Sequence, residues 1–142
     1  MSDLDANKQL VRKLIEDVLN LGNAEHLEQY AASNIVDHNH IILGAPSGPG
    51  GAAAGVTAFL EAFPDFRADV GQLVAEGDVV VASLTMRGTN SGPYHGITSP
   101  TQQYAEWEAI AIFTIVEGKV TEIRGLTDRM ALMTQLGILP NG

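Results

Sequence analysis

The densest group of chemically active side chains is the run Asp-His-Asn-His at residues 37–40. If this run is extended, His38 and His40 point to one side and Asp37 to the other, since side chains alternate along a strand. A histidine that faces an apolar cavity can accept and return a proton near neutral pH. We therefore expect His38 to act as an acid or base and His40 to contact a ligand.

Two histidines separated by one residue can also bind a metal ion, which normally needs a third ligand. His95 or a glutamate could supply it, but the ordered glutamate and late histidine of a cupin-type metal barrel are missing. Another alternative is that His38 and His40 are polar rim residues, hydrogen-bonded to the loop that follows. We favour proton transfer, and we expect no metal and no other cofactor.

Tyr94 and His95 lie in a long loop, residues 89–102, between two predicted strands. Loops at the mouth of a sheet often carry ligand contacts. Tyr94 is therefore a candidate for substrate binding and His95 for catalysis, although His95 could equally be an ordinary exposed residue.

The run at residues 104–116 is the longest predicted strand, and its two faces differ. Glu106 and Glu108 share one face with Ile110, and we expect that face to meet solvent or a partner subunit. The other face combines large with small side chains, which leaves room for a ligand. We expect it to line an apolar cavity and to contribute Trp107, Ala109, Ala111 and Phe113.

Hydrophobic periodicity predicts the elements that position these residues. We expect helices at residues 7–21, 24–31 and 56–63, a loop at 44–55, and a terminal helix at 128–137 with Asp128 as its N-cap. Strands are expected at 34–43, 66–75, 79–88, 104–116 and 120–127. Helices followed by an antiparallel meander indicate the α+β class.

Composition limits the kind of protein. The chain has 142 residues, 45% of them hydrophobic, which predicts a single domain over residues 1–142. A net charge of −9 with scattered basic residues argues against nucleic acid as a partner. No apolar run is long enough to span a membrane, and the chain has no cysteine, which is compatible with the cytoplasm, the location we expect.

With these motifs in view, the chain resembles the SnoaL-like, or ester cyclase, branch of the polyketide cyclases in the NTF2-like superfamily. The resemblance covers nearly the whole chain, and its stretches follow the family's order: residues 30–38, 59–66, 74–82, 86–89, 96–97 with 100–101, 106–108, 117–122 and 127–137. It implies a conical barrel, in which a curved antiparallel sheet encloses an apolar cavity closed by N-terminal helices. It also implies a homodimer formed through the outer face of the sheet.

The family's cyclases use an aspartate on the last strand as acid and base, without a cofactor. The matching position here is Gly125, three residues before Asp128. Because related isomerases carry a catalytic acid where His38 aligns, the resemblance implies that His38, supported by Asp37 or His95, transfers the proton. The cavity would then offer Ile123 and Gly125 to the substrate, in addition to the residues named above.

We therefore expect a cofactor-independent cyclase or isomerase acting on a polyketide-like or similarly apolar biosynthetic intermediate. An alternative is a module that binds a small hydrophobic metabolite without converting it, which the absence of the aspartate favours. A further alternative is an epoxide-opening enzyme, for which Asp128 with Arg124 or Arg129 would have to serve.

Overall fold

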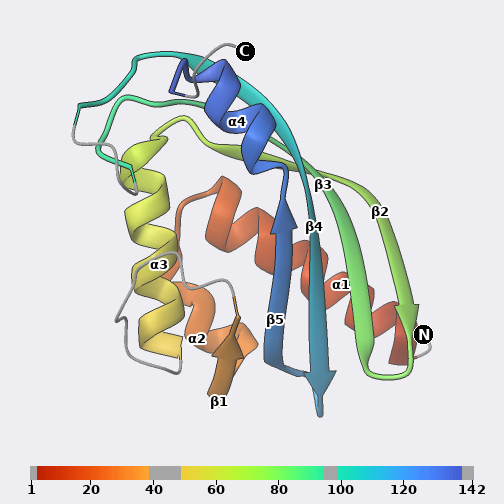
Figure 1. Cartoon of the computed structure of the whole chain (residues 1–142). Helices are drawn as coiled ribbons and strands as arrows, with labels where there is room; N and C mark the ends of the chain where they lie inside the picture. Colours follow the sequence, from red (N-terminus) through yellow and green to blue (C-terminus); the bar gives the residue numbers. More distant parts are fainter. Residues whose placement is uncertain (1–2, 39–48, 95–98, 139–142) are drawn as a thin grey trace.

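Helices form most of the first part of the chain and strands most of the rest (Figure 1). In this computed structural model we describe residues 3–38, 49–94 and 99–138. The helical elements are α1 (Asp3–Leu14), a π-helical turn (Ile15–Asn20), a 3-10 turn (Ala24–His26), α2 (Leu27–Tyr30), α3 (Pro49–Ala62) and α4 (Arg129–Gln135). The strands are β1 (Ala31–Asp37), β2 (Arg67–Glu76), β3 (Val79–Thr89), β4 (Tyr104–Val116) and β5 (Lys119–Thr127).

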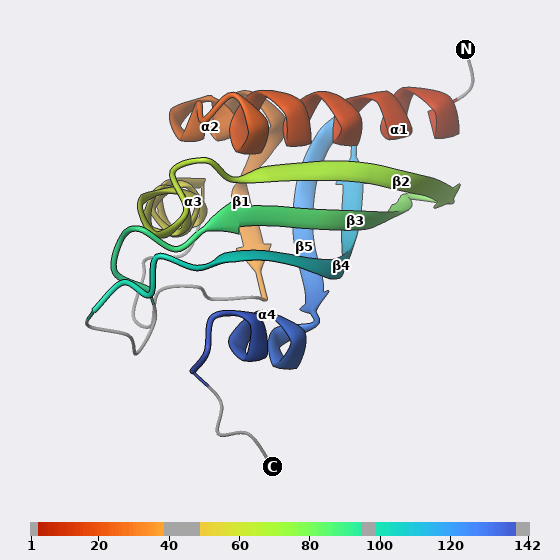
Figure 2. The same cartoon turned by 90° about the horizontal axis from the view of Figure 1, so that it is seen from above.

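The strands form one curved, open sheet in the order β1-β5-β4-β3-β2. Figure 2 shows the strands lying between α1 and α4, and α1 and α3 close the inner side of the sheet. The predicted α+β class, with a curved sheet and N-terminal helices, is confirmed. None of the helices in the described residues is long and apolar enough to cross a membrane.

The predicted antiparallel sheet needs one correction, because β1 runs parallel to β5. Strands β2 to β5 pair as consecutive antiparallel neighbours. The chain enters β1 from α2 and reaches the free edge of β5 without a hairpin, so no tight turn fixes its direction. Both edge strands are irregular, with register shifts between Ala31 and Val36 in β1 and between Val70 and Leu73 in β2.

The predicted loop at residues 44–55 is wrong for its second half, because α3 begins at Pro49. Proline is favourable at the first helical position, where its missing N–H would have no helical partner. Three alanines, at positions 52–54, then favour the helix despite the glycines around them. Residues 44–48 lie outside the described part of the chain.

The predicted first helix is confirmed, but its last turn is π-helical. Val11, Leu14, Ile15 and Val18 form its buried stripe. Asn20 ends the turn and pairs with the backbone of Ala68 at the start of β2: its amide donates to the carbonyl oxygen at 2.9 Å, and its side-chain oxygen accepts from the N–H at 2.7 Å. This pair of bonds fixes the helix against the sheet.

A polar cluster around Asp17 joins the π-helical turn to α2. The carboxylate accepts hydrogen bonds from the Tyr30 hydroxyl at 2.6 Å and the Asn23 amide at 2.9 Å, and the His26 ring lies 2.9 Å away. These bonds, Tyr30 first, lower the pKa of Asp17 from 3.8 to about 2. In return, the bond to Asp17 raises the pKa of Tyr30 to about 12.

This cluster predicts how acid affects stability. Asp17 binds its proton at lower pH in the folded protein than in the unfolded chain, so its contribution is complete above about pH 4 and is lost as the pH falls towards 2. Tyr30→Phe should weaken this acid dependence and lower the thermal midpoint at neutral pH by a few degrees. Circular dichroism melts at several pH values test both effects.

Tyr104→Phe is the matched control, because Tyr104 is exposed on β4 and its hydroxyl donates to the neighbouring exposed Glu106. It should leave the melting curves close to those of the unmodified protein. An unchanged acid response in Tyr30→Phe would contradict the role given to the Asp17 cluster.

Candidate active site

A cavity of about 410 Å³ lies between the inner face of the sheet and the helices. Ligand pockets of this size commonly hold small molecules. Its walls come from most elements of the fold. The lining residues are Leu14, Ile15, Leu19, His38, Val56, Phe59, Phe66, Leu84, Met86, Tyr94, Trp107, Ala111, Phe113, Ile123, Gly125, Leu126, Thr127 and Arg129.

The middle of the sheet's inner face carries only small side chains. The strand registers place Ala82, Ala111 and Gly125 side by side across β3, β4 and β5. The next row along the strands is larger and pairs Phe113 with Ile123. Because the central row carries nothing larger than a methyl group, the curved sheet leaves a hollow there instead of a packed core.

Aromatic rings close one end of the cavity. The ring centroid of Phe59, on α3, lies 4.8 Å from that of Phe66, and the two ring planes meet at 89°. The ring centroids of Phe59 and Trp107 are 6.3 Å apart. Tyr94 packs edge-on against Phe59 at 5.9 Å and against Phe63 at 5.4 Å. Such tilted contacts are favourable and restrict ring movement, so this wall is rigid and apolar.

The loop that carries Tyr94 is fixed by Asn90, whose side chain is completely buried. The Asn90 amide donates to the carbonyl oxygens of Gly92 at 2.9 Å and Ala62 at 3.3 Å. Its side-chain oxygen accepts from the N–H and the hydroxyl of Thr101 at 2.9 and 3.0 Å. Asn90 therefore ties both ends of the loop to the end of α3, and so positions Tyr94.

His38 lies at the rim of the cavity, just after β1. Its backbone N–H donates to the carbonyl oxygen of Ile123 at 2.9 Å, which continues the pairing with β5. Its Nε2 lies 2.6 Å from Oε1 of Glu122, and 37% of the side chain is exposed. Glu122 also accepts a hydrogen bond from Arg124 at 3.2 Å.

These contacts determine the chemistry open to His38. Hydrogen bonds, first from His38 and then from Arg124, lower the pKa of Glu122, so the carboxylate stays ionised. A neutral imidazole that donates from Nε2 to a carboxylate keeps its lone pair on Nδ1, where it can accept a proton. A histidine oriented by a carboxylate in this way is suited to general acid and base catalysis.

Most of the predicted site residues surround the cavity. His38, Tyr94, Trp107, Ala111, Phe113, Ile123 and Gly125 all line it. Ala109 is buried on the same strand but does not line this cavity. Asp37 is half-buried and pairs in register with Ile123. His40 and His95 lie outside the described residues.

The sequence did not identify Glu122 as the partner of His38, for which Asp37 or His95 was expected. Glu122 and His38 are 84 positions apart and meet only because β1 lies parallel to β5.

The predicted N-cap is confirmed, since the Asp128 carboxylate accepts from the N–H of Ala131 at 3.0 Å. No group of three or more possible metal ligands occurs within residues 3–38, 49–94 and 99–138.

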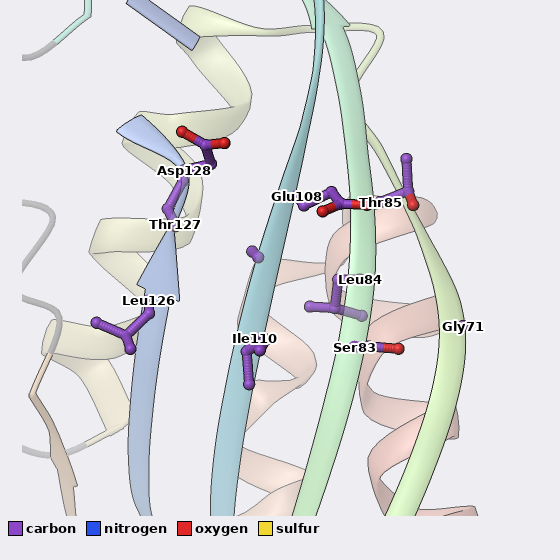
Figure 3. Close-up of a pocket in the computed structure, with 10 residues that line it drawn as sticks. Gly71, Ser83, Leu84, Thr85, Glu108, Ile110, Leu126, Thr127 and Asp128 are labelled. Carbon is purple, nitrogen blue, oxygen red and sulfur yellow. The ribbon is translucent and has the colours of Figure 1, made fainter. Parts of the chain in front are cut away.

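A second hollow, of about 370 Å³, lies on the outer face of the sheet, and Figure 3 shows its lining residues. It includes Ser83, Glu108 and Asp128, together with Ile110 and Leu126. The Ser83 hydroxyl accepts a hydrogen bond from the backbone N–H of Gln72 at 2.8 Å and so supports the irregular part of β2. This hollow lies on the face predicted to meet solvent or a partner.

Comparisons with known proteins agree with this architecture. The sequence profile of the SnoaL-like polyketide cyclases matches residues 9–136, so the chain belongs to this family. No curated protein matches the chain.

Solved structures extend the comparison. TsrD from Streptomyces laurentii is 26% identical, covering 98% of this chain and 100% of its own, with a TM-score of 0.86. A protein of Jannaschia sp. CCS1, provisionally described as a SnoaL-like polyketide cyclase, is 26% identical, with coverages of 99% and 98% and a TM-score of 0.84. IdmH from Streptomyces antibioticus, provisionally a polyketide cyclase, is 25% identical, with coverages of 92% and 98% and a TM-score of 0.77.

The small central row predicts that the cavity can be filled without harm to the fold. Ala111→Leu should keep the thermal midpoint at or above that of the unmodified protein, because the larger side chain occupies empty space. It should weaken binding of methyl anthracene-2-carboxylate, a neutral aromatic probe, by about tenfold or more. Trp107, the only tryptophan, lines the cavity, so quenching of its fluorescence measures binding.

Ile112→Leu is the control on the same strand, because residue 112 is one position along and faces the opposite side of the sheet. It should leave probe binding unchanged. Equal affinities for the probe in Ala111→Leu and the unmodified protein would show that ligands do not enter this cavity.

Proposed function

We propose that the protein is a cofactor-independent cyclase or isomerase that acts on a polyketide-like or similarly apolar intermediate. The observation that carries this proposal is an aromatic-walled cavity with a carboxylate-oriented histidine at its rim, in a chain of the SnoaL-like family. The cavity would fold a flexible substrate and bring its reacting atoms together, which accelerates an intramolecular reaction strongly.

In the proposed cyclisation, Nδ1 of His38 removes a proton from a carbon between two carbonyl groups. The resulting carbanion attacks a second carbonyl carbon of the same molecule, so that a carbon–carbon bond forms and the carbonyl oxygen becomes an alkoxide. The imidazolium then returns the proton to that oxygen, and no atoms are gained or lost. Glu122 is the positioning residue, because its ionised carboxylate holds the ring through the contact with Nε2.

The second candidate is a module that binds an apolar metabolite without converting it. Ala111 and Gly125 favour it, because they leave the central wall without an acid or base. The epoxide-opening alternative has less support. Asp128 is engaged as a helix cap, and Arg124 is paired with Glu122 at 3.2 Å.

We also propose that two copies associate through the outer face of the sheet. This face exposes large apolar side chains, with Ile110 47% and Leu126 77% exposed. Apolar residues in paired register on neighbouring strands form a continuous patch that favours contact with another surface.

Catalysis by His38 predicts a separation of turnover from binding. His38→Ala should lower turnover of a linear tetraketide, supplied both as the free acid and as its N-acetylcysteamine thioester, by about 10²–10⁴-fold, because the proton-transfer group is lost. Glu122→Gln should cause a smaller loss, because the ring stays but is held less well. Liquid chromatography with mass spectrometry detects the cyclic product, which has the mass of the substrate and a different retention time.

Methyl anthracene-2-carboxylate should bind both variants as it binds the unmodified protein. Glu108→Gln, on the outer face, is the matched control for the change at Glu122 and should keep full turnover. Probe binding without turnover of any polyketide substrate in the unmodified protein would support the binding module instead. Unchanged turnover in His38→Ala would remove this residue from the mechanism.

The proposed dimer predicts that Ile110→Glu gives a monomer, because it places a charge in the centre of the apolar patch. Sedimentation velocity at several protein concentrations measures the change. Met130→Glu is the control, since Met130 is 73% exposed on α4 and not on the sheet. An unmodified protein that stays monomeric at every concentration would contradict the dimer.

A further inference from the structure

The cavity contains one positive charge whose role the proposed mechanism does not explain. Arg129 is the first residue of α4 and lines the cavity, yet it is exposed, so it lies at the mouth. The neighbouring carboxylate of Asp128 accepts a hydrogen bond from the N–H of Ala131 and caps the helix. The start of α4 is thereby fixed, and Arg129 with it.

Arg129 differs in its partners from three other arginines of the chain. Within residues 3–38, 49–94 and 99–138, no ion pair joins Arg129 to an acidic side chain. By contrast, three other arginines pair with carboxylates on the protein surface: Arg67 and Arg87 with Asp69, and Arg124 with Glu122. A guanidinium without a carboxylate partner beside an apolar cavity is available to an external anion.

Tyr94 supplies a second donor in the same cavity. Its ring is held between Phe59 and Phe63, and it is half-buried. Burial raises the pKa of Tyr94, while the positive charge of Arg129 acts in the opposite direction. The phenol therefore keeps its proton at neutral pH and can donate it to an oxygen atom. Arg129 and Tyr94 line the same cavity.

We propose that Arg129 and Tyr94 bind the carboxylate of a substrate whose apolar body occupies the cavity. This inference rests on the proposed function, since it specifies the substrate class of the same site: an apolar acid and not its neutral ester or amide. The planar guanidinium matches the two oxygens of a carboxylate, and hydrogen bonds between charged groups are stronger than neutral ones. Phe59, Phe66 and Trp107 would hold the apolar part.

A comparison of an acid with its ester tests this assignment. We expect anthracene-2-carboxylate to quench the fluorescence of Trp107 at concentrations about tenfold lower than methyl anthracene-2-carboxylate does. Arg129→Met should remove this preference by weakening the acid alone, whereas Arg129→Lys should keep part of it. Tyr94→Phe should also weaken the acid more than the ester.

Arg12→Met is the matched control, because Arg12 is exposed on α1, loses the same charge and does not line the cavity. It should retain the preference for the acid. Thermal melts of every variant show whether the fold is intact. Equal binding of acid and ester, or an unchanged preference in a folded Arg129→Met, overturns this inference but leaves the cavity and the proposed catalysis in place. If neither probe binds, both proposals fail.

Discussion

The site depends on a hollow that the sheet's own side chains leave unfilled. A curved sheet covered by helices would normally close its interior with large residues at native packing density. Here the row Ala82, Ala111 and Gly125 crosses the centre of the inner face and carries almost no side-chain volume. The cavity is thus encoded in the cross-strand register of three strands and not in any single element.

The polar side chains of the site lie at the ends of strands and helices or in a loop, and each is held in place by a different contact. His38 follows β1 and is held by Glu122 of β5. Tyr94 lies on a loop fixed by the buried Asn90. Arg129 starts a helix that the preceding residue caps. Because these supports are independent, each of these side chains can change during evolution without disturbing the packed sheet below them.

Local patterns predicted much of this architecture. The alternation of side chains between the two faces of β4 predicted its inner face, and Trp107, Ala111 and Phe113 line the cavity as expected. The spacing of the last turn and helix predicted Asp128 as a cap. By contrast, Glu122 became a partner of His38 only through a parallel pairing between distant segments, which no local periodicity encodes. The start of α3 was missed because glycine and proline suggest a loop, although proline at a first helical position favours a helix.

The two irregular edge strands influence how copies of this protein can meet. An open sheet has free N–H and C=O groups along both borders, and straight borders invite another chain to add as a further strand. Here the border strands β1 and β2 both shift register, and β2 also carries Arg67 and Asp69 near its beginning. Bends and charges of this kind oppose strand-by-strand growth into larger aggregates. Contact through a broad face therefore becomes the easier route, and such contact stops once the two faces have covered each other.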